Sequence, residues 1–163
     1  YQYIDLIVNY IPGAKIIHAC RNPLDNILSI YRAHFAIGNT YSSSLIDCVD
    51  VYLNQEMIIS KFKKKYSSLV YELNYDYLVE NPFKHIYSLI TWLGWNWDDS
   101  YLYPEKNTRS ILTRSNFEAR NPINTKSVSV WKNYRNMLEP VIDRLNCLDK
   151  YSLSDDLDNS NCR

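Results

Sequence analysis

The sequence predicts an α/β protein in which a parallel β-sheet is flanked by helices. Residues 15–20 form a short, nearly continuous apolar run between Pro12-Gly13 and Asn22-Pro23, which is typical of a strand buried on both faces. Segments with helical and strand patterns then alternate along the chain, as in parallel sheets. With 163 residues and 46% hydrophobic content, the chain has enough material for one domain with its own core.

The first elements follow from local chemistry. Residues 3–11 have helical spacing, and the strand at 15–20 leads through a turn at Arg21 into a second helix. Asn22 is a good N-cap, Pro23 suits the first helical position, and Asp25 adds negative charge near the positive helix end. Five apolar residues are expected to face the core, which leaves Asp25 and Ser29 on the opposite side. These apolar residues are Leu24, Ile27, Leu28, Tyr31 and Phe35.

The later elements are predicted in the same way. A polar break is followed by a long helix at 45–66, a second strand at 68–73 and a helix at 83–92 that Gly94 ends as a C-cap. The sequence is loop-like beyond residue 99 until Val128, and the last helix is expected near 137–148. Residues 1–148 are therefore expected to form the domain, and the acidic, Ser- and Asn-rich residues 149–163 a disordered tail.

Arg21 and Ser29 predict an anion site. Arg21 ends the first strand, at the edge where open α/β sheets bind ligands, and Ser29 lies two helical turns further on. A guanidinium offers a fork of donors that matches phosphate oxygens, and a hydroxyl can add a hydrogen bond to the same group. Taken singly, Arg21 could instead pair with Asp25, and Ser29 could be an ordinary helix-surface serine.

Composition excludes several partners. The formal net charge is zero, so no long-range attraction to nucleic acid or to an anionic membrane is expected. No apolar run is long enough to span a bilayer, so a soluble chain is expected, and the first residues lack the pattern of a signal peptide. This lack of a leader, together with reduced cysteines, favours the cytoplasm. The four cysteines show no C-x-x-C spacing, so neither a zinc site nor a disulfide framework is expected, and the cysteines are interpreted as mostly reduced packing residues.

Three landmarks in the correct order resemble the sulfotransferases that use 3′-phosphoadenylyl sulfate (PAPS). They are Arg21-Asn-Pro-x-Asp with Ser29, Tyr75-Asp-x-Leu-Val-x-x-Pro82, and the segment 115–124 running towards Trp131. The nearest branches are the tyrosylprotein sulfotransferases and the bacterial sulfotransferases associated with tetratricopeptide repeats. The resemblance covers about residues 10–145 and implies a P-loop-NTPase-like parallel sheet.

The resemblance also implies roles for particular residues. Arg21 and Ser29 match the pair that holds the 3′-phosphate, and Tyr75 matches a tyrosine beside the nucleotide. Ser115 and Arg120 lie in the segment that matches a loop over the adenosine phosphate. The implied reaction is sulfuryl transfer from PAPS to an acceptor hydroxyl or amine, with no metal required. The acceptor stays open among protein tyrosine, carbohydrate and small molecules.

The chain also departs from the family pattern. Val130 and Ala33 stand where the tyrosylprotein branch has basic residues, and no glycine- and lysine-containing loop for the 5′-phosphosulfate is found. Because the chain opens on Tyr1 and enters a helix and strand at once, we expect the fold to be incomplete at the N-terminus, and we assign no catalytic residue. His18 is interpreted as a structural histidine inside a strand, although it could border the cleft.

Two alternatives have other functions. A noncatalytic nucleotide-binding or interaction domain could keep this scaffold without turnover, and the chain as given could be inactive because the phosphosulfate loop and the general base are absent. A P-loop kinase relative would share the parallel sheet but needs a Walker A loop, which this sequence lacks. Tyr75 could equally be a core or turn tyrosine, since the chain has 15 of them.

Overall fold

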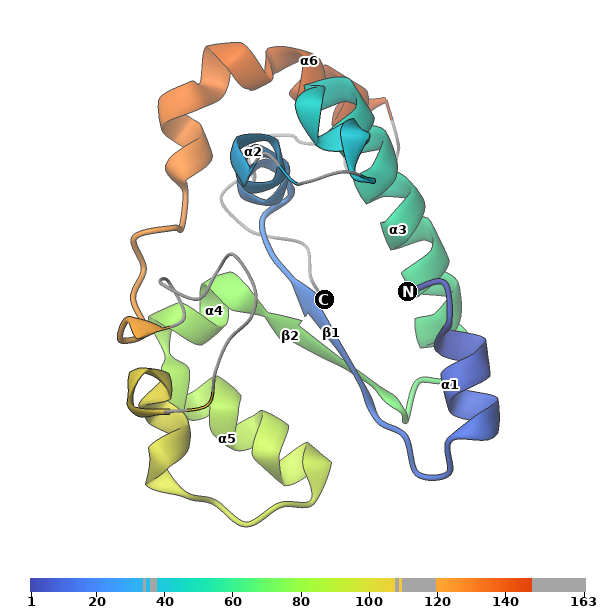
Figure 1. Cartoon of the computed structure of the whole chain (residues 1–163), viewed down its shortest axis with the longest axis vertical. Coiled ribbons are helices and arrows are strands. Elements are labelled where there is room, and N and C mark those ends of the chain that lie inside the picture. The colour runs from blue at the N-terminus through green and yellow to red at the C-terminus, as the bar shows by residue number, and fades with distance from the viewer. Residues whose placement is uncertain (34, 36–37, 108, 110–119, 148–163) are drawn as a thin grey trace.

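A computed structural model describes residues 1–33, 35, 38–107, 109 and 120–147 of the chain. Its helices and strands follow one another in the predicted order, with one additional short helix, α4, after the second strand (Figure 1). They are α1 (Ile4–Tyr10), β1 (Ile16–Cys20), α2 (Pro23–Ala33), α3 (Leu45–Lys65), β2 (Val70–Asn74), α4 (Tyr75–Glu80), α5 (Pro82–Leu93) and α6 (Arg135–Asn146). Short 3-10 helices occur at Thr40–Ser43, Asp99–Leu102, Pro104–Lys106 and Val130–Tyr134.

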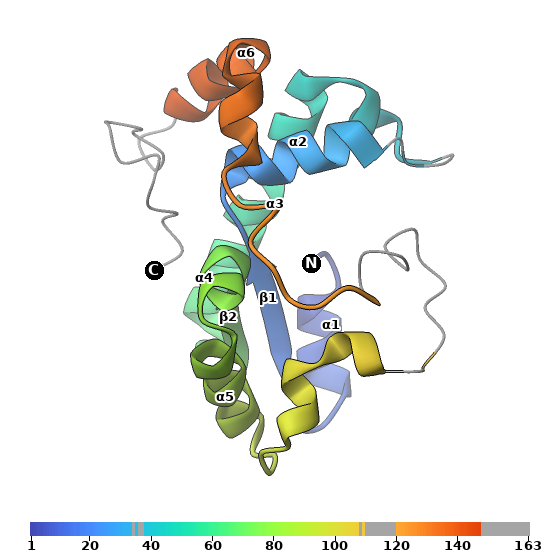
Figure 2. The same cartoon turned by 90° about the vertical axis from the view of Figure 1, so that its left-hand side faces the viewer.

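The two strands pair in parallel, as predicted. The register runs from Ile16 opposite Val70 to Cys20 opposite Asn74, so both strands end at the same level. Helices α1 and α3 lie on one side of this small sheet, and α4 and α5 lie on the other (Figures 1 and 2). The architecture is compatible with an α/β fold whose sheet is flanked by helices.

Local sequence signals fix several element ends where they were expected. Asn22 Oδ1 accepts the backbone N–H groups of Leu24 at 3.0 Å and Asp25 at 3.3 Å, which caps α2. Gly94 follows α5 with φ of 76°, the left-handed conformation that glycine adopts without a steric penalty. The predictions of the α2 start and the α5 end are confirmed.

The main core lies where α2, α3 and α6 meet, at one end of the molecule. Leu24, Ile27 and Leu28 of α2 are buried, as the helical spacing predicted. They pack with side chains of α3, α6 and the 3-10 helix that precedes α6; these are Cys48, Val49, Tyr52, Trp131, Leu138, Val141, Ile142 and Leu145. Packing in this core fixes the position of α2, the helix that follows the carboxyl end of β1.

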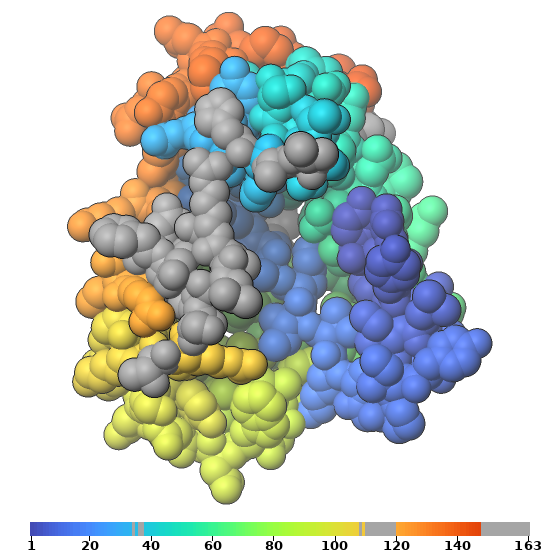
Figure 3. All heavy atoms as spheres, viewed as in Figure 1, coloured from blue at the N-terminus to red at the C-terminus, as the bar shows by residue number. Residues whose placement is uncertain are grey.

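Two expectations about burial are wrong, and one short helix was not predicted. β1 is not buried on both faces, because Ile17 is 43% exposed and Ala19 is exposed too. Figure 3 shows atoms of β1, coloured medium blue, on the surface of the molecule. Phe35 is 44% exposed because α2 ends at Ala33, before the chain can return it to the core. The residues after β2 form the short helix α4, in which the side chain of Asn74 caps Tyr77.

Cys48 and Cys147 are free, which agrees with the interpretation of these two cysteines as reduced. None of the described helices is both long and apolar enough to cross a membrane. The described part of the chain contains no cluster of three or more His, Cys, Asp or Glu side chains that could hold a metal ion. The expected tail at 149–163 lies outside the described residues.

Candidate functional site

The parallel register brings Arg21 and Tyr75 together at the end of the sheet. Cys20 is paired with Asn74, so the residue that follows each strand leaves the sheet at the same level. The Arg21 guanidinium carbon lies 5.0 Å from the centre of the Tyr75 ring. This cation–π contact orients the guanidinium across the end of the sheet.

Asp76 is the acidic partner of this corner, and the sequence analysis missed it. Its carboxylate is buried; Oδ2 accepts the backbone N–H of Asn22 at 2.8 Å, and Oδ1 lies 3.7 Å from Arg21 Nε. Burial raises the pKa of Asp76, while the Asn22 N–H and the charge of Arg21 act in the opposite direction. Its position directly after Tyr75, beyond the end of a strand, was the signal that could have identified it.

A third contact comes from a distant part of the chain. Arg21 Nη2 donates a hydrogen bond to the carbonyl oxygen of Ser127. The guanidinium is therefore held by Tyr75, Asp76 and Ser127, three partners that are not its sequence neighbours. Its side chain still keeps 19% of its accessible surface. A fixed, partly open guanidinium at the carboxyl end of a strand is suited to bind an anion.

The segment that contains Ser127 is in turn held by Asp25. This residue is 3% exposed, and its two carboxylate oxygens accept backbone N–H groups of Ser129 at 2.7 Å and Trp131 at 2.8 Å. The prediction that Asp25 lies on the outer side of α2 is wrong, because the loop before α6 covers that side. The alternative pairing of Arg21 with Asp25 is not what the structure has, since Arg21 pairs with Asp76.

The structure gives less information on whether the other predicted site residues belong to the site of Arg21. Ser29 is on the exposed side of α2, as predicted, and takes no part in the hydrogen bonds around Arg21 among the described residues. Arg120 is exposed, and Ser115 lies outside the described residues. Trp131 is 2% exposed and belongs to the core. The structure thus brings Arg21 and Tyr75 into contact and leaves the participation of Ser29, Ser115 and Arg120 as predictions.

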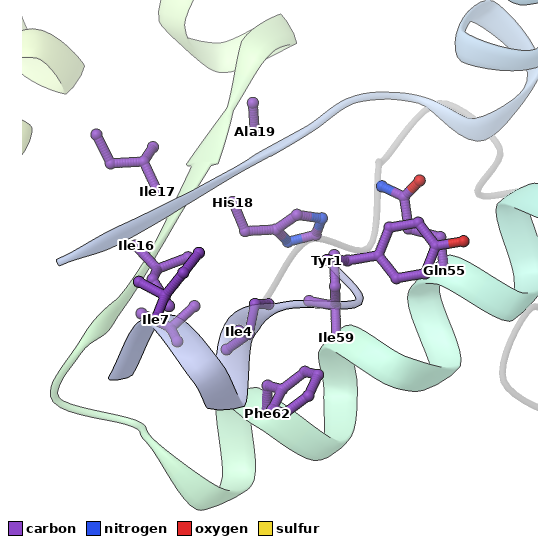
Figure 4. Close-up of a pocket in the computed structure, with 11 residues that line it drawn as sticks. Tyr1, Ile4, Ile7, Ile16, Ile17, His18, Ala19, Gln55, Ile59 and Phe62 are labelled. Atoms are coloured by element: carbon purple, nitrogen blue, oxygen red, sulfur yellow. The ribbon is translucent and has the colours of Figure 1, made fainter. Parts of the chain in front are cut away.

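A separate pocket of about 320 Å³ lies between β1, α1 and α3. Figure 4 shows the His18 ring projecting from β1 towards Gln55 and Tyr1, with apolar side chains around the rest of the pocket. His18 is 6% exposed, and its Nε2 atom lies 3.4 Å from Glu56 Oε1, while Nδ1 has no hydrogen-bond partner. The interpretation of His18 as a buried strand histidine agrees with this position, although the residue also borders a cavity.

The fold and the corner together define a class of protein. This is an α/β chain with a positive side chain fixed at the carboxyl ends of parallel strands, the place where such proteins bind ligands. A family model described as "Sulfotransferase family" matches residues 1–99, a range that includes Arg21, Ser29 and Tyr75. The chain belongs to the sulfotransferase family.

A comparison with curated proteins finds a relative whose description names no activity. The chain is 32% identical over 148 residues to an uncharacterized protein of Aquifex aeolicus (strain VF5). The aligned region covers 89% of this chain and 19% of that protein, so the chain spans about a fifth of the relative's length.

Proposed function

We propose that this chain carries the 3′-phosphate-binding half of a PAPS-dependent sulfotransferase site. The reaction is the transfer of a sulfuryl group from PAPS to an acceptor hydroxyl or amine. The observation that carries the proposal is the Arg21 guanidinium, which is held by Tyr75, Asp76 and Ser127 and remains partly exposed. Membership of the sulfotransferase family supports the reaction class.

Arg21 has the central role in binding. Its guanidinium would form charge-assisted hydrogen bonds with the 3′-phosphate, and Asp76 would keep Nε turned away from the ligand. Tyr75 would stack against the other side of the guanidinium and border the nucleotide. Ser29, Ser115 and Arg120 are proposed as further donors to the phosphate, on the strength of the motif alone. The P-loop-like form of the complete sheet belongs to the same proposal.

The reaction then needs positioning more than covalent chemistry from this half of the site. The acceptor oxygen or nitrogen attacks sulfur in line, the bond from sulfur to the phosphate oxygen breaks, and adenosine 3′,5′-bisphosphate leaves with the electron pair. The acceptor's proton passes to a base that we assign to no residue of this chain. Arg21 fixes the donor, so its contribution appears first in nucleotide affinity.

Calorimetric titration with adenosine 3′,5′-bisphosphate tests the proposal on the natural protein that contains these 163 residues. Arg21→Ala removes a charge-assisted interaction of about 1.5 to 3 kcal/mol, so the dissociation constant should rise roughly 10- to 100-fold. Arg144→Ala is the matched control, because Arg144 forms an exposed ion pair with Asp50 on other elements. Equal affinities in the wild type and Arg21→Ala would remove Arg21 from the site.

A turnover assay separates the enzyme from a noncatalytic relative. The expected result is conversion of PAPS to adenosine 3′,5′-bisphosphate that depends on an added acceptor and falls in Arg21→Ala. Nucleotide binding that depends on Arg21, without turnover on phenolic, carbohydrate or protein acceptors, would instead support a binding domain built on the same scaffold.

A further inference from the structure

Asp25 links two segments that are far apart in the sequence. It lies in the first turn of α2, four residues after Arg21, and both of its carboxylate oxygens are used. Oδ2 accepts the N–H of Ser129 at 2.7 Å and Oδ1 accepts the N–H of Trp131 at 2.8 Å. Hydrogen bonds of backbone N–H groups to a buried carboxylate are stronger than those between neutral groups. The carboxylate therefore fixes the turn at residues 127–131 against the start of α2.

The turn held by Asp25 has a conformation that needs support. Ser129 has φ of 58°, the left-handed region that a residue with a Cβ adopts only when its surroundings hold it there. The side chain of Trp131 anchors the other end of the turn in the core, where it is 2% exposed. Asp25 thus holds the backbone at Ser129, the residue with the unfavourable positive φ.

The same turn reaches Arg21. The carbonyl oxygen of Ser127, two residues before Ser129, accepts a hydrogen bond from Arg21 Nη2. A continuous set of contacts therefore runs from Asp25 through the backbone of residues 127–131 to the guanidinium. No step of it depends on direct contact between Asp25 and a ligand.

From these contacts we infer that Asp25 is a positioning residue for the 3′-phosphate site, acting through the 127–131 turn on the orientation of Arg21. The inference rests on the proposed function and adds a residue whose role is neither helix capping nor ligand binding. Loss of one carboxylate oxygen should let the turn move, release Ser127 from Arg21 and weaken binding of the 3′-phosphate in particular.

Asp25→Asn is the most informative substitution, because it keeps the shape of the side chain. The amide retains one acceptor oxygen and places an NH2 donor against a backbone N–H donor, so one of the two hydrogen bonds is lost. The readout is the ratio of dissociation constants for adenosine 5′-monophosphate and adenosine 3′,5′-bisphosphate, measured by calorimetry on the natural protein. This ratio isolates the contribution of the 3′-phosphate, which a general loss of structure would not change selectively.

The wild-type ratio is measured first. A wild type that binds both nucleotides equally well contradicts the proposed function itself, and the inference falls with it. Where the wild type prefers the bisphosphate, the expected effect of Asp25→Asn is a roughly tenfold fall of the ratio, with affinity for the monophosphate within about twofold of wild type. An unchanged ratio, or an equal loss of affinity for both nucleotides, overturns the inference while the proposed function stands.

Asp50→Asn is the matched control. Asp50 also loses one carboxylate oxygen, but its partner is Arg144 at an exposed contact between α3 and α6, and its ratio should equal that of the wild type. If circular dichroism shows that Asp25→Asn does not fold, the comparison is made with Asp25→Glu, which displaces both oxygens by ~1.5 Å. A wild-type ratio in a folded Asp25→Glu protein would then overturn the inference.

Discussion

The carboxyl end of β1 and the side of β1 that faces α1 and α3 differ in how their side chains are held. At the carboxyl end, Arg21 and Asp76 form an ion pair, Arg21 also binds the backbone carbonyl of Ser127, and Asp76 also accepts the backbone N–H of Asn22. On the side facing α1 and α3, His18 borders a mostly apolar pocket and keeps a nitrogen without a partner. Polar contacts are directional and fix one arrangement, whereas apolar packing around a cavity leaves room for substitution. The strand end is therefore expected to be the more sensitive of the two regions.

The largest effect is expected from Asp76→Ala. The substitution leaves the buried N–H of Asn22 and the Arg21 guanidinium without their acidic partner, which should lower the free energy of unfolding by about 3 kcal/mol. Urea unfolding measures the loss. Asp50→Ala, at an exposed ion pair, should cost less than about 1 kcal/mol. Equal losses in the two variants would contradict the claim that the strand end is the more tightly held region.

A pair of identical substitutions contrasts the pocket with the packed core. Val70 lines the pocket, so the extra methylene of Val70→Ile has space and should leave stability unchanged or raise it by up to about 0.8 kcal/mol. Val49 is 0% exposed in the core, and Val49→Ile should cost about 1 to 3 kcal/mol through overpacking. Thermal and urea unfolding of both variants give the comparison, and destabilisation of equal size would show that the pocket is not open space.

The buried carboxylate at the strand end should leave a signature in the pH dependence of stability. Burial raises the pKa of Asp76 above its ordinary value of 3.8, so the folded state keeps a proton that the unfolded chain has already released. The Asp76 contribution to stability is therefore present below about pH 4. It is lost as the pH rises through the raised pKa, by at most about 1.4 kcal/mol per pH unit.

Unfolding measured from pH 3 to pH 8 for the wild type and Asp76→Asn tests this sign. The stability of the wild type relative to Asp76→Asn should fall as the pH rises. A relative stability that increases with pH would mean that the ion pair with Arg21 outweighs burial, and would reverse the stated direction.

The smallest effect is expected at the turn before α6. Ser129→Gly removes the steric penalty of φ at 58° but increases the entropy of the unfolded chain, so the net gain should be about 0.5 kcal/mol. Ser129→Ala keeps a Cβ at the same angle and should give no gain. Differential scanning calorimetry of both variants resolves the difference, and stabilisation by alanine equal to that by glycine would locate the cause outside the backbone angle.

Local signals explain the part of the fold that sequence reasoning predicted. Asn22, Pro23 and Gly94 act on their immediate neighbours, so the start of α2 and the end of α5 follow from residue type. The apolar run at 15–20 predicted β1, and the alternation of elements predicted parallel pairing. The short helix α4 was missed because six residues carry too little periodicity to distinguish a helix from a turn.

Long-range contacts explain the part that was not predicted. Helical spacing places Asp25 opposite the apolar stripe of α2 and so predicted an outer position, yet its partners lie 104 and 106 residues further along the chain. The 43% exposure of Ile17 depends on how far the neighbouring helices extend over β1, which strand composition does not report. The position of Asp76 after a strand was a sequence signal, but its pairing with Arg21 depends on the register of the two strands.

The sequence by itself determined the order of elements, the position of Arg21 at the end of a strand and the motifs of the sulfotransferase family, because each depends on neighbouring residues or on spacing. Only the tertiary structure decided what holds the guanidinium and which side of α2 is covered. Those outcomes depend on the parallel register and on a loop more than 100 residues away. No local preference encodes the meeting of such distant segments, since packing and hydrogen bonding between them are settled by the whole chain at once.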